Sequence, residues 1–240
     1  MFTIQEAQWD TEYFGIPCAK AEITGVLSKD AVCDFRKQTA PFRYITVSNP
    51  DMYAQNNATL VALPGAFHAD TNILLKNSAP FPCDIELSCD MELTLSDCAV
   101  LEDISEQVRG AFSASRFYHD PHITPEQADG IYINWLKNAQ QKENKYFCVC
   151  RIKGAFAGLI LFRKDSPDTA LIELIFTAAT FRKAGVGTAM MQRLFAFCAE
   201  NGIPQILVGT QKRNETALSF YRKNGFQDEA ITHIFHIWKD

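Results

Sequence analysis

One short segment combines residue types that could hold a diphosphate. Apolar residues 174–176 predict a strand, Arg182 and Lys183 follow in a short loop, and Gly185 and Gly187 begin an amphipathic helix. Glycine lets the backbone approach a ligand closely, and the first amide groups of a helix favour phosphate because they lie at the positive end of its dipole. The same pattern also fits a plain strand-to-helix turn, so the spacing alone leaves both interpretations open.

The pattern Arg182-x-x-Gly185-x-Gly187 resembles the acetyl-CoA motif of the GNAT acetyltransferases. The resemblance extends over residues 146–238, because the predicted elements there follow in the order of that family. It implies that the sheet opens beside the motif strand, where backbone groups bind pantetheine and polarise the thioester. Thr177 and Ala179 depart from the usual Val and Pro of this strand. The acetyl-CoA-binding residues implied by the resemblance are Ile175, Phe176, Thr177, Arg182, Lys183, Ala184, Gly185, Val186, Gly187, Thr188 and Asn214.

A second signature consists of Asn214, Ala217, Phe220, Tyr221 and Gly225, whose spacing resembles the later part of the same family pattern. The resemblance implies that Asn214 contacts CoA and that Tyr221 faces the thioester sulfur, which makes Tyr221 the general acid. A thiol has a pKa of about 8.5 and a phenol about 10, so this proton transfer costs about 2 kcal/mol unless the site lowers the pKa of the tyrosine. The alternative is that Tyr221 packs in the core beside Ala217.

Glu173 is the candidate general base. It stands two residues before the segment implied to bind pantetheine, where many members of the family carry an acidic side chain that faces the acceptor. Because the amine must arrive unprotonated, Glu173 or a water would accept its proton. A solvated or ion-paired carboxylate is the alternative. Four histidines could act as proton relays or be structural, namely His119, His122, His233 and His236.

Candidate acceptor-binding residues precede the predicted strands: Ser115, Arg116 and Phe117, and then Tyr132 and Trp135 on a predicted helix. This combination resembles the dTDP-fucosamine (dTDP-4-amino-4,6-dideoxygalactose) acetyltransferases of surface-polysaccharide biosynthesis, as does the N-terminal run Trp-Asp-Thr-Glu-Tyr-Phe-Gly. The resemblance implies a small nucleotide-sugar acceptor. Aromatic rings can stack on a base or sugar, and arginine can bind a diphosphate bidentately. Alternatively, Arg116 forms a surface ion pair and the aromatic residues pack between helices.

The chain is predicted to form two domains. The segment 77–82 contains two prolines and small polar residues, which disfavour helices and sheet interiors, so it predicts a boundary between domains 1–82 and 83–240. The first is expected to be a small α/β domain with strands at 18–24 and 42–47 and a helix at 29–38. The second is expected to be an α+β domain with the GNAT fold, a central mixed, mostly antiparallel sheet flanked by helices. Its predicted elements are helices at 97–111, from 124, at 185–201 and at 214–224, strands at 146–152, 155–163, 170–178 and 206–209, and a closing pair of strand segments to 238.

Composition excludes several classes of function. The 240 residues carry 23 basic and 28 acidic side chains without a basic run, which argues against a nucleic-acid partner. No run of 18 uncharged apolar residues predicts a membrane span, and no secretory signal is apparent, so we expect a cytoplasmic protein. We expect the eight cysteines to be free and mostly buried. Cys148 and Cys150 share a strand face but lack two further ligands, so no metal is expected.

These observations together predict an acetyl-CoA-dependent N-acetyltransferase that acts by direct attack of an amine on the thioester, without a covalent enzyme intermediate. A peptide or protein N-terminal acetyltransferase is the alternative enzyme. A non-catalytic module that senses acyl-CoA is the alternative outside enzymes. An exposed terminal strand could pair two subunits into a homodimer.

Overall fold

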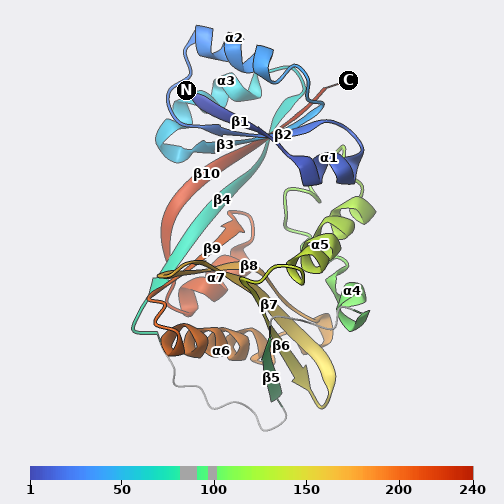
Figure 1. Cartoon of the computed structure of the whole chain (residues 1–240), viewed down its shortest axis with the longest axis vertical. Helices are drawn as coiled ribbons and strands as arrows, with labels where there is room; N and C mark the ends of the chain where they lie inside the picture. Colours follow the sequence, from blue (N-terminus) through green and yellow to red (C-terminus); the bar gives the residue numbers. More distant parts are fainter. Residues whose placement is uncertain (82–90, 97–101, 240) are drawn as a thin grey trace. The chain divides into compact units, whose positions relative to one another are not determined.

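The computed structural model describes residues 1–81, 91–96 and 102–239 (Figure 1). By their internal contacts, these residues form two compact units. The first comprises Met1–Ile73, Gln211–Arg213 and Ala230–Asp240, and the second comprises Leu74–Thr210 and Asn214–Glu229. This division differs from the expected boundary after residue 82, because the end of the chain returns to the first unit. Asp97, the expected start of a helix, lies outside the described residues.

The first unit contains short strands and helices that alternate along the chain. Its strand at 18–24 and helix at 29–38 were predicted closely, whereas β1 and α1 were not predicted. Its elements are β1 (Phe2–Glu6), α1 (Gln8–Phe14), β2 (Cys18–Ile23), α2 (Lys29–Gln38), β3 (Tyr44–Pro50), η1 (Asp51–Asn56), α3 (Asn57–Val61), and parts of β4 (Ala66–Ser78) and β10 (Gln227–Trp238).

Helices cover both faces of the sheet in the first unit. Adjacent residues of a strand point to opposite faces, and β2 buries both Cys18 and Ala19. Ala19 packs in a cluster with Phe35 from α2 and Leu60 from α3. Cys18 belongs to a second cluster, against which Phe14 of α1 packs. Thus α2 and α3 lie on one face, and α1 lies on the other.

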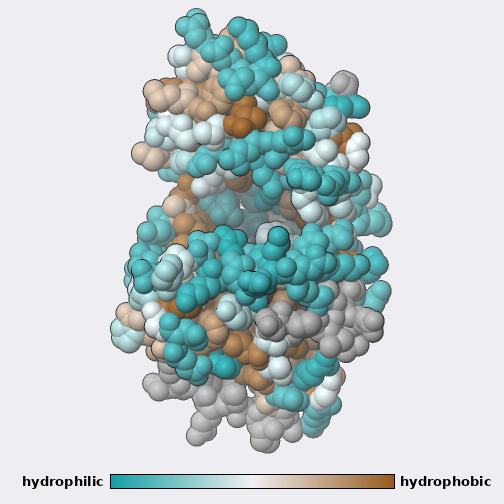
Figure 2. All heavy atoms as spheres, viewed as in Figure 1, coloured by the Kyte–Doolittle hydropathy of each residue, from teal (hydrophilic) through white to brown (hydrophobic). Residues whose placement is uncertain are grey.

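The helix α2 forms where its sequence provides a cap and a single apolar anchor. The Ser28 side chain caps it by accepting a hydrogen bond from the backbone N–H of Ala31 at 3.2 Å. Phe35 is its buried residue. The remaining surface is largely polar, and Figure 2 shows hydrophilic side chains over this helix.

The second unit carries the segments with the candidate chemistry. Its elements are the rest of β4 and β10, β5 (Met91–Ser96), α4 (Glu102–Val108), α5 (Pro125–Ala139), β6 (Lys145–Ile152), β7 (Ala155–Ser166), β8 (Thr169–Thr177), η2 (Ala179–Phe181), α6 (Val186–Glu200), β9 (Gln205–Gln211) and α7 (Glu215–Lys223). The predicted closing pair of strand segments is wrong, because β10 is one continuous strand. β5 was not predicted.

The predicted mixed, mostly antiparallel sheet with flanking helices is confirmed. In the second unit the strand order is β4-β9-β8-β7-β6-β5. The pairs β5–β6, β6–β7 and β7–β8 are antiparallel, and β8–β9 is parallel. In the first unit, β10 lies between β3 and β4, while β1 is at the sheet edge. The helix α6 packs on β6, β7 and β8 (Figure 1).

Capping side chains mark the starts of two predicted helices, α5 and α7. Thr124 and Gln127 form a reciprocal capping box at α5, with Pro125 in its first turn. The Asn214 side chain accepts a hydrogen bond from the backbone N–H of Ala217 at 3.1 Å and so caps α7. Local side-chain chemistry therefore sets where the two helices begin.

The described cysteines are free thiols, as expected. Cys18, Cys148, Cys150 and Cys198 are buried, and Cys33 is exposed. Burial raises the pKa of Cys148 to about 12, which keeps this thiol protonated at neutral pH. Within residues 1–81, 91–96 and 102–239, no cluster of side chains is suited to hold a metal ion. The helices of the same residues include none with the length and apolar character of a membrane span.

Candidate functional site

The strands β8 and β9 remain paired over only part of their lengths. Residues 169–172 of β8 pair with residues 205–208 of β9. Beyond that point, residues 174–177 of β8 pair with β7. Within the described part of the sheet, the β9-facing backbone groups of this segment have no strand partner. Buried backbone groups need a hydrogen-bond partner, so the opening of the sheet offers a place for a ligand.

A β-bulge at Glu173 marks the point where the two strands separate. Ile172 lies opposite Phe162 and Leu174 lies opposite Leu161, which leaves Glu173 as the extra residue of β8. A bulge bends its strand and redirects the side chain that it carries. The bulge therefore contributes to the opening and sets the direction of the Glu173 carboxylate.

A cavity of about 450 Å³ lies at this opening. It brings together β8, the turn before α6 and one side of α7. Its lining residues are Ala111, Ile175, Phe176, Thr177, Phe181, Arg182, Lys183, Gly185, Val186, Gly187, Thr188, Asn214, Thr216, Ala217, Phe220 and Tyr221. All predicted acetyl-CoA-binding residues except Ala184 are among them.

The turn before α6 has the geometry of an anion-binding loop. Lys183 and Gly185 have left-handed backbone conformations, with φ of 65° and 79°. Gly185 is the N-cap of α6, so the first amide groups of that helix have no intrahelical acceptor. A Cβ atom on Gly187 would lie 3.2 Å from the ring of Phe220, so α6 and α7 approach closely here.

Tyr221 lines the cavity from α7, although it is only 3% exposed. Its ring packs against Phe220 and Phe226, with centroid distances of 5.5 and 5.6 Å. Burial raises the pKa of Tyr221, whereas efficient proton transfer to a thiolate calls for a lowered pKa. The phenol therefore stays protonated at neutral pH and can donate a hydrogen bond to developing negative charge.

The Glu173 carboxylate is enclosed by partners and is 2% exposed. Lys145 Nζ lies 2.5 and 2.6 Å from its two oxygens, and Arg163 donates a hydrogen bond to Oε1 at 2.9 Å. The Trp135 indole N–H donates to Oε2 at 3.1 Å. Glu173 does not line the cavity. Glu173 is therefore ion-paired in the structure, as one of the two interpretations of the sequence states. Its role as general base stays a prediction.

Two predicted acceptor residues carry buried polar atoms without partners. Ser115 Oγ and Arg116 Nε are buried and have no hydrogen-bond partner in the described part of the chain. The Arg116 guanidinium lies 4.3 Å from the centre of the Phe117 ring. Unpaired buried polar groups are costly, so these two atoms retain unused hydrogen-bonding capacity.

Aromatic residues connect the acceptor region to the cavity. The Tyr132 ring stacks on Phe112 at 4.2 Å and lies parallel to Trp135 at 6.3 Å. Phe112 in turn meets Phe176, a cavity residue, edge to face at 5.7 Å. Ser115, Arg116, Phe117, Tyr132 and Trp135 do not line the cavity themselves. Trp135 is 37% exposed.

Sequence reasoning did not assign Ala111, Phe181, Thr216, Ala217 and Phe220 to the site. Ala217 precedes Tyr221 by one helical turn, so helical spacing could have placed both on the cavity side. No pattern in the sequence marks Ala111, because only the tertiary fold brings it close to the cavity residues of β8. None of the four candidate histidines is among the lining residues of the cavity.

Comparison with known sequences identifies relatives of this part of the chain. The sequence model of the acetyltransferase (GNAT) family matches residues 106–226, just over half of the chain. A spore coat polysaccharide biosynthesis protein, SpsD of Bacillus subtilis, is 22% identical over 195 residues, which cover 81% of this chain and 62% of that protein. The chain spans 59–64% of the length of the curated relatives that it matches.

Solved structures share the fold at low sequence identity. A conserved protein of unknown function from Staphylococcus epidermidis has a TM-score of 0.69 at 10% identity and covers 93% of this chain and 85% of its own. A GCN5-related N-acetyltransferase from Sphaerobacter thermophilus has a TM-score of 0.63 at 12% identity and covers 99% of this chain and 76% of its own.

Proposed function

Because the chain belongs to the GNAT family of acetyltransferases, we propose that it transfers the acetyl group of acetyl-CoA to the amine of a nucleotide-linked amino sugar. The observation that carries this proposal is the cavity between the opened strand β8 and the helices α6 and α7. There, backbone groups, an arginine and a buried tyrosine converge on one space, as a thioester with a diphosphate tail requires.

The residues at the coenzyme end fit acetyl-CoA in chemical type. The amide groups at the start of α6 would bind the diphosphate, together with the cations of Arg182 and Lys183. The backbone of Ile175–Thr177 would pair with pantetheine where β9 leaves it free. When bound, acetyl-CoA supplies an activated acetyl group on a good leaving group.

The chain's own residues would then divide the work of the transfer. Backbone N–H groups of β8 stabilise the negative charge that develops on the carbonyl oxygen as the amine nitrogen attacks the carbonyl carbon. Tyr221 gives its phenolic proton to the sulfur as the carbon–sulfur bond breaks, and recovers a proton from solvent. A water accepts the amine proton, because hydrogen bonds from three side chains already occupy the Glu173 carboxylate.

The acceptor region supports a nucleotide sugar. The unpaired Arg116 Nε suits a diphosphate oxygen, Ser115 Oγ suits a hydroxyl or phosphate group, and the exposed face of Trp135 suits a base or sugar ring. The name of the relative SpsD, which refers to polysaccharide biosynthesis, is consistent with a sugar acceptor. We propose a dTDP-4-amino-4,6-dideoxyhexose as the acceptor, because residues 115–117 and the helix with Tyr132 and Trp135 resemble the dTDP-fucosamine acetyltransferases.

The test is release of free thiol from acetyl-CoA in the presence of a panel of amines. The panel contains dTDP-4-amino sugars, UDP-amino sugars, short peptides and polyamines. We expect rapid release with dTDP-4-amino sugars alone. Release with peptides alone would support acetyl-CoA as the acetyl donor but would show that the acceptor is a peptide and not a nucleotide sugar. Binding of acetyl-CoA without release from any amine would contradict the enzyme and favour a module that senses acyl-CoA.

A further inference from the structure

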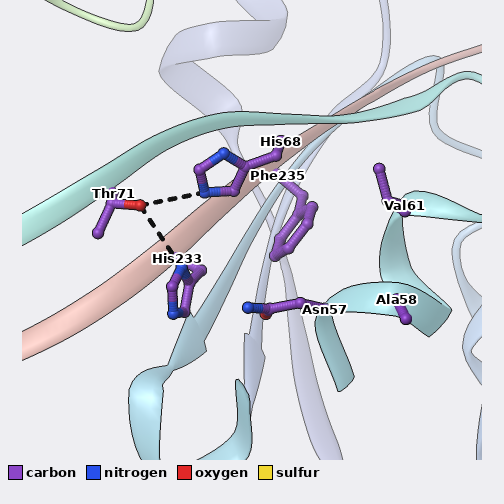
Figure 3. Close-up of a pocket in the computed structure, with 7 residues that line it drawn as sticks. All are labelled: Asn57, Ala58, Val61, His68, Thr71, His233 and Phe235. Atoms are coloured by element: carbon purple, nitrogen blue, oxygen red, sulfur yellow. Dashed lines mark hydrogen bonds between the residues drawn. The ribbon is translucent and has the colours of Figure 1, made fainter. Parts of the chain in front are cut away.

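The first unit holds a second cavity, which shares no lining residue with the proposed acetyl-transfer site. It has a volume of about 420 Å³, and Figure 3 shows its lining residues, Asn57, Ala58, Val61, His68, Thr71, His233 and Phe235. All of them belong to the first unit. We call its apolar side chains, Ala58, Val61 and Phe235, the apolar wall, and its two imidazoles, hydroxyl and amide the polar wall.

A chain of hydrogen bonds runs along the polar wall. Asp51 Oδ1 lies 2.9 Å from His233 Nε2, and His233 Nδ1 lies 3.5 Å from Thr71 Oγ1. Thr71 Oγ1 also lies 3.2 Å from His68 Nε2, and Figure 3 shows Thr71 between the two imidazoles. The chain therefore joins a carboxylate, an imidazole and a hydroxyl in that order.

The direction of these bonds follows from the chemistry of the groups. A carboxylate only accepts, so His233 donates from Nε2. In the tautomer with its proton on Nε2, the Nδ1 lone pair of His233 faces the Thr71 hydroxyl, and His68 Nε2 then donates to Thr71 Oγ1. A hydroxyl that donates to an imidazole, itself oriented by a carboxylate, is activated as a nucleophile. Asp51, His233 and Thr71 thus have the roles of an acid–base–nucleophile triad.

The Asn57 amide can bind a carbonyl oxygen. Asn49 Nδ2 donates to Asn57 Oδ1 at 2.7 Å, which fixes the Asn57 amide, and Figure 3 shows its nitrogen directed toward His233. Burial, His233 and Arg213 lower the pKa of His68, so this imidazole is neutral at pH 7 and has a single N–H, which Thr71 Oγ1 accepts when its own proton goes to His233. Asn57 is therefore the candidate donor to an oxyanion.

The apolar wall defines the substrate class. Phe235, Ala58 and Val61 would contact a short acyl chain or an aromatic group. No lysine or arginine lines the cavity in the described part of the chain, so a neutral ligand suits it better than a phosphate.

We infer that this cavity is a second active site, at which Thr71 and His233 hydrolyse a small neutral carboxylic ester. The Thr71 oxygen bonds to the carbonyl carbon, and His233 Nδ1 takes the hydroxyl proton. The carbon–oxygen bond to the alcohol breaks, and the alcohol leaves with that proton. Water then attacks the acyl-Thr71 ester, again by way of His233, and releases the carboxylic acid. Water is the sole co-reactant, and the site does not depend on the proposed acetyl transfer.

The test measures hydrolysis of p-nitrophenyl acetate by the full chain and by variants. Thr71→Val keeps the shape of the side chain without its hydroxyl, and we expect a loss of at least about 100-fold, the lower range of nucleophile and base catalysis. Thr71→Ser should retain the activity. Thr24→Val, at an exposed threonine of the same unit, is the matched control and should leave the rate unchanged.

Two further measurements keep the inference open to refutation. Acid quench and peptide mass analysis should locate an acetyl group on Thr71 of the wild-type chain, and circular dichroism should show that Thr71→Val is folded. An unchanged rate in folded Thr71→Val would mean that imidazoles react with the ester without the hydroxyl, and would overturn the inference. So would a wild-type rate no higher than that of free imidazole.

Discussion

The coenzyme end and the acceptor end of the proposed site are built by different means. The coenzyme end uses consecutive residues, from Arg182 to Thr188, whose backbone conformation is set by a turn and a helix start. The acceptor end uses side chains from α5 and the segment before it, tied to β6, β7 and β8 by Glu173. Backbone sites tolerate changes of side chain, whereas sites made of side chains depend on each partner.

Among the variants that test this comparison, Tyr221→Phe should have the largest effect on catalysis. Loss of the phenolic proton should lower kcat about 10²- to 10⁴-fold, the range of general acid catalysis, with little change in the Kd of acetyl-CoA. Steady-state kinetics and calorimetry measure both quantities. Tyr146→Phe, at a partly buried tyrosine of the same unit, is the control. An unchanged kcat would favour the alternative that Tyr221 is a core residue.

The raised pKa of Tyr221 leads to a prediction about the pH dependence of kcat. Burial raises the pKa of Tyr221 above its ordinary value of about 10, so the acid form is retained as the pH rises to that value. We therefore expect no fall in kcat from ionisation of Tyr221 below pH 10. A fall that disappears in Tyr221→Phe would contradict the raised pKa.

Arg116→Ala should weaken binding of the acceptor but not binding of acetyl-CoA. The loss of a charge-assisted contact should raise the KM of the nucleotide sugar about 10- to 100-fold, while the Kd of acetyl-CoA stays within a factor of two or so. Arg116→Lys should recover part of the loss, because lysine keeps the charge without the bidentate geometry. Arg109→Ala, at an exposed arginine, is the control. Equal kinetics for Arg116→Ala and Arg109→Ala would mean that Arg116 does not bind the acceptor.

Glu173→Gln distinguishes a positioning role from a role as base. If Glu173 holds Trp135, kcat should fall by no more than about 5-fold, the KM of the acceptor should rise, and the shape of the pH profile should persist. A loss of about 10²-fold or more in kcat, together with loss of the acidic limb of the profile, would instead make Glu173 the base. Glu173→Ala should also destabilise the chain by about 1–3 kcal/mol, because Lys145 and Arg163 lose their shared partner.

The smallest expected effect is that of Trp135→Phe. Phenylalanine preserves an aromatic face next to Tyr132 but cannot donate the hydrogen bond to Glu173. The acceptor KM should rise about 5-fold, which corresponds to one ordinary hydrogen bond of about 1 kcal/mol. A similar rise for Trp135→Ala would mean that the indole N–H alone accounts for the contribution of Trp135 and that its ring face does not take part in recognition.

Local signals made several elements of the second unit predictable. Thr124, Pro125 and Gln127 mark the start of α5, and Asn214 marks that of α7, because a cap satisfies amide groups within a few residues of itself. The turn proposed to bind the coenzyme could be predicted for the same reason, since its glycines and its helix are adjacent in sequence. The predicted ranges of α2 and α6 therefore agree with the structure to within one residue at each end.

Other features depended on contacts between distant segments. The strand β5 carries a weak pattern of its own and was missed, although it pairs with β6 along its length. The bulge at Glu173 was missed as well, because a bulge depends on the register of two strands and the sequence of one strand does not reveal it. The partners of Glu173 lie 28, 10 and 38 residues away along the chain.

The sequence by itself determined the order of the main elements from α5 to α7, the residues that cap α5 and α7, and the residues of the turn proposed to bind the coenzyme. Each of these rests on interactions within a few residues, which a linear pattern displays. The tertiary structure decided the opening between β8 and β9, the raised pKa of Tyr221 and the enclosure of Glu173. It also decided the series of hydrogen bonds that connects Asp51, His233, Thr71 and His68. These depend on burial and on distances between segments remote in sequence, because electrostatics and hydrogen bonds act through space and not along the chain.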